Sequence, residues 1–153
     1  MMPLQRIAFF RSAQRLYDAC CAPVCAACGL TRCELDVLAF LHNNPGFDTA
    51  QQVAEIRMLP KANVSQAVDG LMRKGLLTRR PDEADRRRLH LRLTPAAAGP
   101  AAQIAAAQQR FTALLLGGLD AGERAQLEIL SEKLDRSAQQ ALERIRSDAA
   151  EQQ

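Results

Sequence analysis

The chain has 153 residues, of which 48% are hydrophobic and 24% charged, and its formal net charge is +3. This length suits one domain with a real core, and the composition excludes a disordered chain. No apolar run approaches the ~18 residues that a membrane-spanning helix needs. Arginines also interrupt the N-terminal segment, which therefore lacks the apolar stretch of a secretory signal. We expect a cytoplasmic protein.

The first predicted helix covers residues 3–20, where apolar residues recur at steps of three and four. Pro23 and Gly29 are expected to break it. A second helix begins at Thr31, because Thr31 and Glu34 have the spacing of a capping box. It ends at residues 43–46, and its predicted core residues are Leu35, Leu38, Ala39 and Leu41.

A third helix is predicted from Thr49, which forms a second capping box with Gln52 and precedes the expected core residues Val53 and Ile56. Residues 58–59 form a short connection to a fourth helix.

The fourth helix is expected to carry Pro60 in its first turn and to run to about Lys74, with Gly75 as its left-handed cap. Its predicted core residues are Val64, Val68 and Leu71. Gly70 lies inside this helix at a cost of roughly 1 kcal/mol relative to Ala. Nothing in the sequence explains it.

After Gly75 the hydrophobic period changes from helical to alternating. Residues 76–80 and 88–93 are predicted as two strands of a hairpin, joined by the polar segment 81–87. A long helix then follows from Thr94–Pro95 to about Leu116, and a last one runs from the capping pair Asp120 and Glu123 to about Asp148.

Positive charge is concentrated in the fourth helix and the hairpin. Residues 57–92 contain ten Lys or Arg and four acidic residues, a net of +6 within a chain of +3. Such a concentration on one short unit is typical of a protein that binds nucleic acid. Two short capped helices followed by a basic hairpin predict a winged helix-turn-helix, whose second helix suits the major groove and whose hairpin suits the DNA backbone or minor groove.

The same residues resemble the multiple-antibiotic-resistance regulator (MarR) family. The resemblance is carried by Leu30–Thr31, by Arg73–Gly75, by the D-x-x-D-R-R pattern at 82–87 and by Leu93–Thr94. It implies a mainly α fold with a small β-hairpin wing, a winged helix-turn-helix DNA-binding domain at 31–94, and dimerisation helices at 3–20 and 95–150. It also implies a homodimeric transcription regulator, acting as a repressor on a pseudo-palindromic double-stranded DNA operator.

By this likeness the residues that face base edges are Lys61, Asn63, Ser65 and Gln66. Arg86 and Arg87 would occupy the wing tip, with Asp85 orienting one guanidinium through a bidentate pair. The chain departs from the family pattern at Pro60, where a capping serine is usual, and at Gln66, where an arginine is common. For the remaining basic residues, DNA contact and a solvated surface both stay open: Arg73, Lys74, Arg79, Arg80, Arg88 and Arg92.

All five cysteines lie within fourteen residues, at Cys20, Cys21, Cys25, Cys28 and Cys33. We expect them at the end of the first helix, in the following loop and at the start of the second helix. They could bind zinc or another thiolate-bound metal, or an iron–sulfur cluster. They could instead form a redox switch, with Cys33 as one candidate thiolate, or pack as small hydrophobic residues. The expected effector is therefore a small molecule, a metal or an oxidant.

Other functions find less support in the sequence. The nucleophile, P-loop, zinc-protease and dinucleotide motifs of common enzymes are missing, so we expect no enzyme. A Cys-x-x-Cys thiol oxidoreductase would need a βαβ pattern, and a helical protein-interaction module would not need the basic hairpin. His42 is interpreted as a partly buried histidine, with a metal ligand as the alternative, and His90 as a surface group of the wing.

Overall fold

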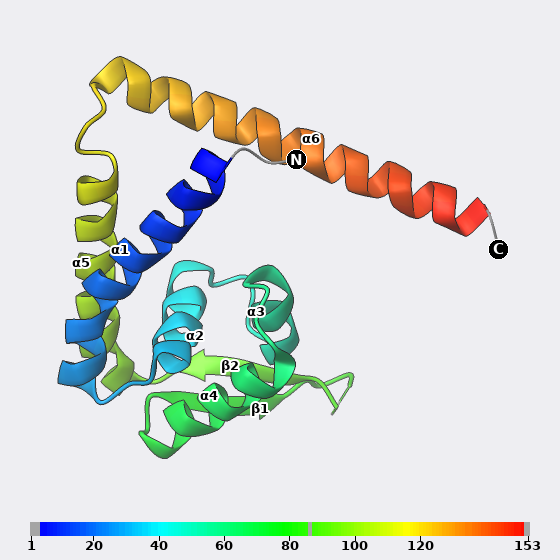
Figure 1. Ribbon diagram of the computed structural model, residues 1–153. Coiled ribbons are helices and arrows are strands. Elements are labelled where there is room, and N and C mark those ends of the chain that lie inside the picture. The colour runs from blue at the N-terminus through cyan, green and yellow to red at the C-terminus, as the bar shows by residue number, and fades with distance from the viewer. Residues whose placement is uncertain (1–3, 86, 152–153) are drawn as a thin grey trace. The chain divides into compact units, whose positions relative to one another are not determined.

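The computed structural model describes residues 4–85 and 87–151. Its elements in chain order are α1 (Leu4–Cys28), α2 (Arg32–Asn43), α3 (Ala50–Ile56), α4 (Lys61–Arg73), β1 (Leu77–Pro81), β2 (Leu89–Leu93), a 3-10 turn (Pro95–Ala97), α5 (Ala98–Leu115) and α6 (Ala121–Glu151) (Figure 1). The chain forms two compact units, one up to Thr112 and one from Ala113. The fold is mainly α with one β-hairpin, as the sequence predicts.

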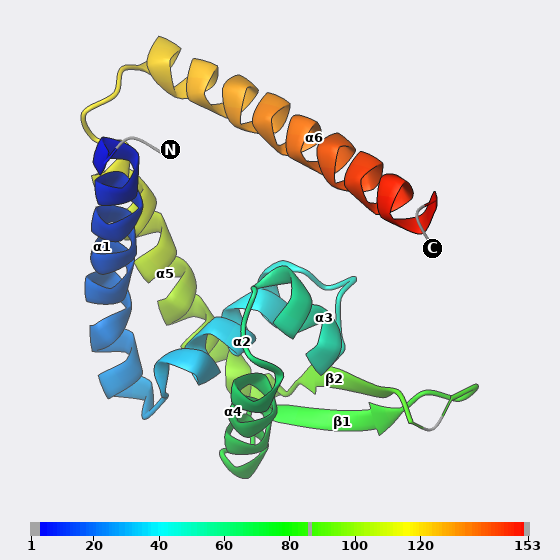
Figure 2. The ribbon, with the colours of Figure 1, turned by 45° about the vertical axis from the view of Figure 1, so that its right-hand side comes forward.

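The first unit has a helical pair beside a smaller winged-helix core. Helices α1 and α5 lie side by side in both views (Figures 1 and 2), and the rings of Tyr17 and Phe111 meet edge to face 5.2 Å apart. Helices α2, α3 and α4 pack on one another and on the hairpin. The buried core comes largely from α2 and α4, whose fully buried side chains include Leu35, Leu38 and Leu71.

Helix α1 continues eight residues beyond its predicted end. Pro23 lies inside the helix, so the prediction that it breaks the helix is wrong. Proline removes one backbone hydrogen bond, but its neighbours Cys21 and Val24 are buried in the core and stabilise the helical course on either side of it. The helix ends instead at Gly29, whose φ of +62° is the left-handed cap that glycine favours.

The predicted capping boxes of α2 and α3 are both confirmed. The Glu34 carboxylate accepts the N–H of Thr31 at 2.7 Å, and the Thr31 hydroxyl accepts the N–H of Glu34 at 3.2 Å. The same reciprocal pair joins Thr49 and Gln52 at the start of α3. The predicted core residues of α2 are all buried, and the helix ends at Asn43 as expected.

The prediction that Ile56 is a core residue of α3 is wrong. Val53 is fully buried, but the side chain of Ile56 is 52% exposed. Ile56 is the last residue of a helix of only two turns. The chain then turns away at Met58, whose φ of +52° is left-handed, so the final residue of α3 does not reach the core.

Helix α4 buries its predicted apolar side, including Val64, Val68 and Leu71. It ends at Arg73, and Gly75 has a φ of +71°. The N–H of Leu76 bonds to the carbonyl of Leu71 at 2.9 Å, which closes the left-handed cap and sends the chain directly into β1.

The hairpin formed by residues 77–93 is here called the wing. Its two strands are antiparallel, with Leu77 opposite Leu93, Arg79 opposite Leu91 and Pro81 opposite Leu89. Leu91 is buried under α2 and α3, whereas Leu89 is 39% exposed because it lies where the wing extends past the core. The base of the wing is therefore anchored by apolar contacts, and its tip is not.

Thr94 precedes a short 3-10 turn before α5, and its side chain does not cap that turn. Its hydroxyl donates instead to the carbonyl of Gly75 at 2.6 Å and so ties the end of β2 to the end of α4. In the second unit, the Asp120 and Glu123 capping pair is confirmed at 2.9 Å in both directions, and α6 runs to Glu151. No helix in the described part of the chain is long and apolar enough to cross a membrane.

Candidate nucleic-acid interface

Four polar side chains form an exposed row on the first two turns of α4, and we call them the contact row: Lys61, Asn63, Ser65 and Gln66. Their neighbours Val64, Ala67 and Val68 are buried. One side of the helix is thus anchored while the other presents donors and acceptors to solvent. Asn and Gln side chains can bond adenine in two places, and Lys can bond guanine or phosphate. These four side chains are exposed together, and their role in contacting bases stays a prediction.

The start of α4 has no side-chain cap, because Pro60 stands at the N-cap position. Its carbonyl still accepts the N–H of Asn63 at 3.0 Å. The first N–H groups of α4, beside Lys61, therefore have no side-chain cap. A helix start with free N–H groups and a nearby cation favours phosphate groups.

The position of α4 depends on a buried carboxylate from α2. Glu34 is 4% exposed, and its side chain bonds to the Lys74 ammonium at 2.5 Å. A Cβ on Gly70 would lie 1.9 Å from the Glu34 carboxylate oxygen, so only glycine allows this approach. This contact is the physical reason for the glycine that the sequence left unexplained.

The charge of Glu34 is stabilised in place. Burial raises the pKa of this carboxyl, but the hydrogen bonds from Lys74 and from the Thr31 backbone outweigh burial, and the net pKa is lowered. The ionised Glu34 thus caps α2 and holds the end of α4 at the same time. Lys74, one of the basic residues left open by the sequence, is engaged in this contact.

The wing loop is organised by Asp82 more than by Asp85. One carboxylate oxygen of Asp82 accepts the N–H groups of Ala84 at 2.8 Å and of Asp85 at 2.9 Å. Among the described residues, Asp85 bonds to the backbone N–H of Arg87 at 3.0 Å instead of forming the predicted bidentate pair with a guanidinium. Both acids shape the backbone of the loop, because each accepts main-chain N–H groups.

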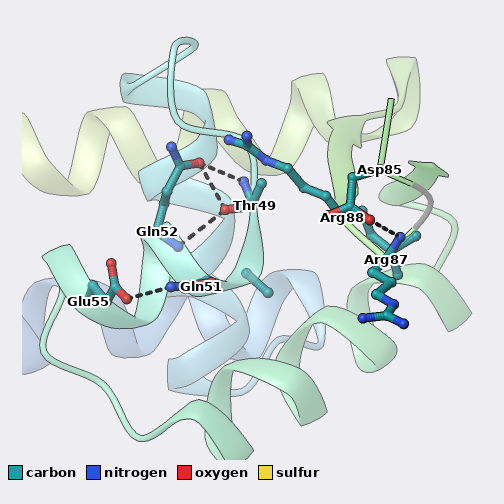
Figure 3. A pocket seen from close by; sticks show the side chains of 9 residues that line it. Thr49, Gln51, Gln52, Glu55, Asp85, Arg87 and Arg88 are labelled. Atoms are coloured by element: carbon teal, nitrogen blue, oxygen red, sulfur yellow. Dashed lines mark hydrogen bonds between the residues drawn. The ribbon is translucent and has the colours of Figure 1, made fainter. Parts of the chain in front are cut away.

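Arg87 and Arg88 of the wing are exposed and face an open groove. Arg87 and Arg88 line a hollow of about 620 Å³ together with Thr49, Gln52 and Glu55 of the α3 segment. Figure 3 shows the two side chains leaving the wing in different directions, with Arg88 directed toward Thr49. Arg86, a predicted contact, lies outside the described residues.

Other predicted basic residues have different surroundings. The guanidinium of Arg79 bonds to Asp69 of α4 at 2.7 Å and so links the wing to that helix. Arg73, at the end of α4, is exposed. Arg80 and Arg92 are exposed on the strands of the wing.

The two histidines differ from their sequence interpretations. His42 is exposed, so the interpretation as a partly buried side chain is wrong. His90 is no simple surface group: its Nδ1 lies 2.8 Å from the Asp48 carboxylate and its Nε2 lies 2.9 Å from the Asp82 carboxylate. We call these three residues the wing clamp. No local pattern predicts the wing clamp, since Asp48 and His90 are 42 residues apart.

The cysteines do not occupy a loop, because α1 continues to Cys28. Four of them lie on the last turns of α1, and Cys33 lies on α2, where its thiol donates to the Asn63 carbonyl of α4 at 3.5 Å. Desolvation raises the pKa of Cys21, Cys25 and Cys33. In the part of the chain that the structure describes, no three Cys, His, Asp or Glu side chains are grouped to hold a metal.

A second cavity of about 470 Å³ lies between α1, α2 and α5 of the first unit. Its walls combine the aromatic rings of Phe10, Tyr17 and Phe111 with the guanidiniums of Arg32 and Arg57. The Arg32 guanidinium stacks over the Tyr17 ring at 4.6 Å.

An ion-pair network runs from α1 to the end of α3 beside this cavity. Arg32 bonds to Asp18 of α1 and, at 3.1 Å, to Asp36 of α2; Arg57 bonds to the same Asp36 at 3.2 Å. A ligand that contacted either guanidinium would therefore compete with a bond that positions a helix of the winged domain.

The winged helix, its exposed contact row and its basic wing lie within one stretch of sequence, and the profile of the MarR family matches residues 29–88. This segment is similar to the MarR family. The matched segment contains all of α2, α3, α4 and β1 and the loop of the wing. No curated protein sequence matches the chain.

Solved structures of MarR-family regulators have the same fold. BpsR of Bordetella bronchiseptica, whose DNA binding is described as regulated by 6-hydroxynicotinic acid, is 24% identical over 86% of this chain and 98% of its own, with a TM-score of 0.68. MarR of E. coli in its apo form is 23% identical over 88% and 97%, with a TM-score of 0.68. A probable transcriptional regulator from Pseudomonas aeruginosa is 26% identical over 86% and 96%, with a TM-score of 0.65. The chain thus has the fold of MarR-family transcription regulators.

Proposed function

We propose that the protein is a homodimeric transcription repressor that binds a pseudo-palindromic double-stranded DNA operator and releases it when an effector binds. The observation that carries this proposal is the exposed contact row of α4, which is held from behind by buried apolar residues and by Glu34. Such a helix can enter the major groove without rearranging.

In this proposal the contact row and the wing have different tasks. Asn63 and Gln66 bond to base edges, while Lys61 bonds to guanine or phosphate and Ser65 adds a polar contact. Arg86, Arg87 and Arg88 follow the backbone or the minor groove, where they add affinity that depends little on sequence. Arg73 is placed to reach a phosphate beyond the end of α4, and Arg79 supports the wing through Asp69.

Dimerisation is supported by apolar side chains that are exposed on the second unit. On α6, large exposed residues recur at helical spacing: Leu127, Leu130, Leu134, Leu142 and Ile145. A solvent-facing stripe of this kind is typical of an interface. Two winged domains in a dimer would then meet half-sites about one helical turn, ~34 Å, apart.

The central test is selection of bound sequences from random DNA duplexes, followed by anisotropy titrations at several salt concentrations. Gln66→Ala should relax the base preference at one position in each half-site and cost about 1–3 kcal/mol there. Gln109→Ala, an exposed glutamine on α5, is the matched control and should change nothing. Failure of the reduced protein to bind any duplex at low salt would refute the proposal.

For the effector we propose a small aromatic carboxylate bound in the 470 Å³ cavity. The aromatic rings there suit a planar ligand, and Arg32 and Arg57 suit its carboxylate. The relative BpsR responds to 6-hydroxynicotinic acid, which has this chemistry and is a suitable first probe in calorimetry. Binding should weaken in Arg57→Gln and remain in Arg92→Gln, a control on the wing.

The cysteine cluster is the other candidate for the signal, as a redox or metal sensor. Raised pKa values keep Cys21, Cys25 and Cys33 protonated near neutral pH, which slows their reaction with peroxide. A metal such as zinc, or a cluster, would require the thiols to regroup. The cavity is therefore the better supported effector site, and the cysteine cluster is the second candidate. Thiol counting before and after peroxide, with metal analysis of protein purified without oxygen, tests it.

A further inference from the structure

The His90 ring joins two parts of the winged domain that are distant in sequence. Asp48 lies in the segment before α3, and Asp82 lies at the start of the wing loop; each carboxylate bonds to one ring nitrogen of His90. The side chain of His90 is 24% exposed, so the contact is sheltered but open to protons. A histidine between two acids is a specific arrangement, and nothing in the proposed DNA contacts requires it.

Asp48 and Asp82 also bond to the main chain, and these bonds connect His90 to β2 and to the wing loop. The backbone carbonyl of Asp48 accepts the N–H of Leu91 at 2.6 Å, so this residue holds β2 from the main chain as well as from its side chain. The other carboxylate oxygen of Asp82 accepts two N–H groups of the wing loop. Asp82 therefore connects His90 directly to the loop that carries Arg87, so a change in the protonation of His90 can alter the position of that loop.

The protonation state of His90 decides how many of these bonds can form. A protonated ring has two N–H donors and can bond to both carboxylates, whereas a neutral ring has one donor and turns a lone pair toward the other acid. Hydrogen bonds to Asp82 and then to Asp48 raise the pKa of His90. The pKa of Asp82 is correspondingly lowered to about 2, first by His90 and then by the N–H groups of Asp85 and Ala84.

Charges of both signs lie near the clamp: Glu83 and Asp85 follow Asp82 in the wing loop, and arginines lie along the two strands. Arg80 lies opposite His90 in the strand register, and Arg88 and Arg92 lie two residues before and after it along β2. These arginines oppose a positive ring, while Asp48 and Asp82 favour it. The two acids are in direct contact with the ring and the arginines are not among its bonded partners, so the acids outweigh the arginines and raise the pKa of His90.

We propose that His90 is a positioning residue for DNA binding: its protonated ring ties the wing loop to the segment before α3 and sets the direction in which Arg87 and Arg88 project. This inference rests on the proposed function. When the His90 ring loses a proton, it can donate to only one of the two carboxylates, and the wing can leave the position that suits DNA. We therefore expect the protein to bind its operator more tightly in mildly acidic than in alkaline solution.

The size of the pH effect on DNA affinity depends on the fraction of molecules whose wing is in the position that suits DNA. Apparent affinity falls by the fraction of molecules in which the wing is correctly placed. The contribution of the clamp is complete at pH values below the ordinary histidine pKa of about 6.5. It is lost as the pH rises through the raised pKa of the folded protein.

The first measurement is an NMR titration of the His90 imidazole, which needs no DNA. The pKa of His90 should lie above the ordinary histidine value of about 6.5. Asp82→Asn and Asp48→Asn should each lower it. A His90 pKa at or below the ordinary value would overturn the proposal.

The second measurement is operator affinity between pH 6 and pH 8.5 at fixed ionic strength. Wild-type binding should weaken by about threefold to tenfold over this range. His90→Gln should bind at the alkaline wild-type level throughout, and the control His42→Gln should follow the wild type. A wild-type slope retained in His90→Gln would overturn the proposal and leave the proposed function intact.

A third variant separates a positioning role from a merely structural one. His90→Arg keeps a planar cation with several donors at every pH, so it should restore tight binding at pH 8.5 and remove the pH dependence. Weak binding by a folded His90→Arg at all pH values would contradict the positioning role. If the wild type binds no duplex at any pH, the proposed function fails, and the NMR titration still decides whether the clamp exists.

Discussion

The two parts of the winged domain that face outward are held in different ways. Helix α4 is fixed from behind by buried apolar side chains and by the Glu34 contact at Gly70. The wing has two buried leucines, Leu77 and Leu91, toward its base, and its outer part depends on polar bonds through Asp82, His90 and Asp69. Apolar burial depends little on pH and salt, while partly exposed polar contacts depend on both. We therefore expect the position of α4 to change little with pH and salt, and the position of the wing to change with both.

The largest expected effect is on the core side of this comparison. Leu71→Ala empties a fully buried site under α4 and should lower the free energy of unfolding by about 2–5 kcal/mol. Urea denaturation measures it. Leu89→Ala, on the exposed part of the wing, is the contrasting variant and should cost much less. Similar losses at the two sites would erase the distinction between helix and wing.

The next effect tests the close approach of α2 and α4. Gly70→Ala places a methyl group against the Glu34 carboxylate and should cost about 1–3 kcal/mol in spite of the better helix propensity of Ala. Gly99→Ala in α5 meets nothing within 4 Å and should be neutral or slightly stabilising.

Combining Gly70→Ala with Glu34→Ala should recover part of the loss, because the second change removes the group that clashes. A strictly additive double variant would show that the two residues do not interact.

A smaller effect is expected at the base of the wing loop. Asp82→Ala removes the acceptor for two backbone N–H groups and one end of the wing clamp. Operator affinity should fall by about fivefold to tenfold through loss of the competent wing position, while the unfolding midpoint changes little. Glu83→Ala, the exposed neighbour, is the control. A large drop in stability with unchanged affinity would assign Asp82 to the core instead.

The smallest effect concerns a single phosphate contact. Arg87→Ala should weaken binding to all DNA sequences alike and reduce the slope of log affinity against log salt by about one unit. Gln66→Ala should leave that slope unchanged, because it is neutral. Salt-titrated anisotropy distinguishes the two, and an unaltered slope in Arg87→Ala would exclude a phosphate contact there.

Local signals were reliable where the responsible atoms are close in sequence. The capping boxes at Thr31 and Thr49 join residues three apart, and the left-handed glycine at Gly75 needs only its own backbone. The alternation in the hairpin and the concentration of arginines likewise predicted the wing. The same kind of reasoning failed at Pro23, because burial of Cys21 and Val24 across the helix outweighs the lost hydrogen bond.

Contacts between distant segments had no local signal. Nothing near Gly70 indicates that Glu34, in another helix, fills the space of its missing side chain. The wing clamp likewise joins Asp48, in the segment before α3, to His90 in β2, 42 residues further along the chain. Asp85 was assigned to a guanidinium from the family pattern, but its bond in the described chain is to a backbone N–H, a choice that depends on the course of the loop.

The amino-acid sequence by itself determined the class of the fold, the order of its helices and the hairpin, and the surface that carries the positive charge. These follow from periodicity, capping and charge, each of which acts over a few neighbouring residues. The tertiary structure decided how α4 is held and how the wing is aimed. Those depend on the distance between side chains such as Glu34 and Lys74, or His90 and Asp82, and such distances exist only once the chain has folded.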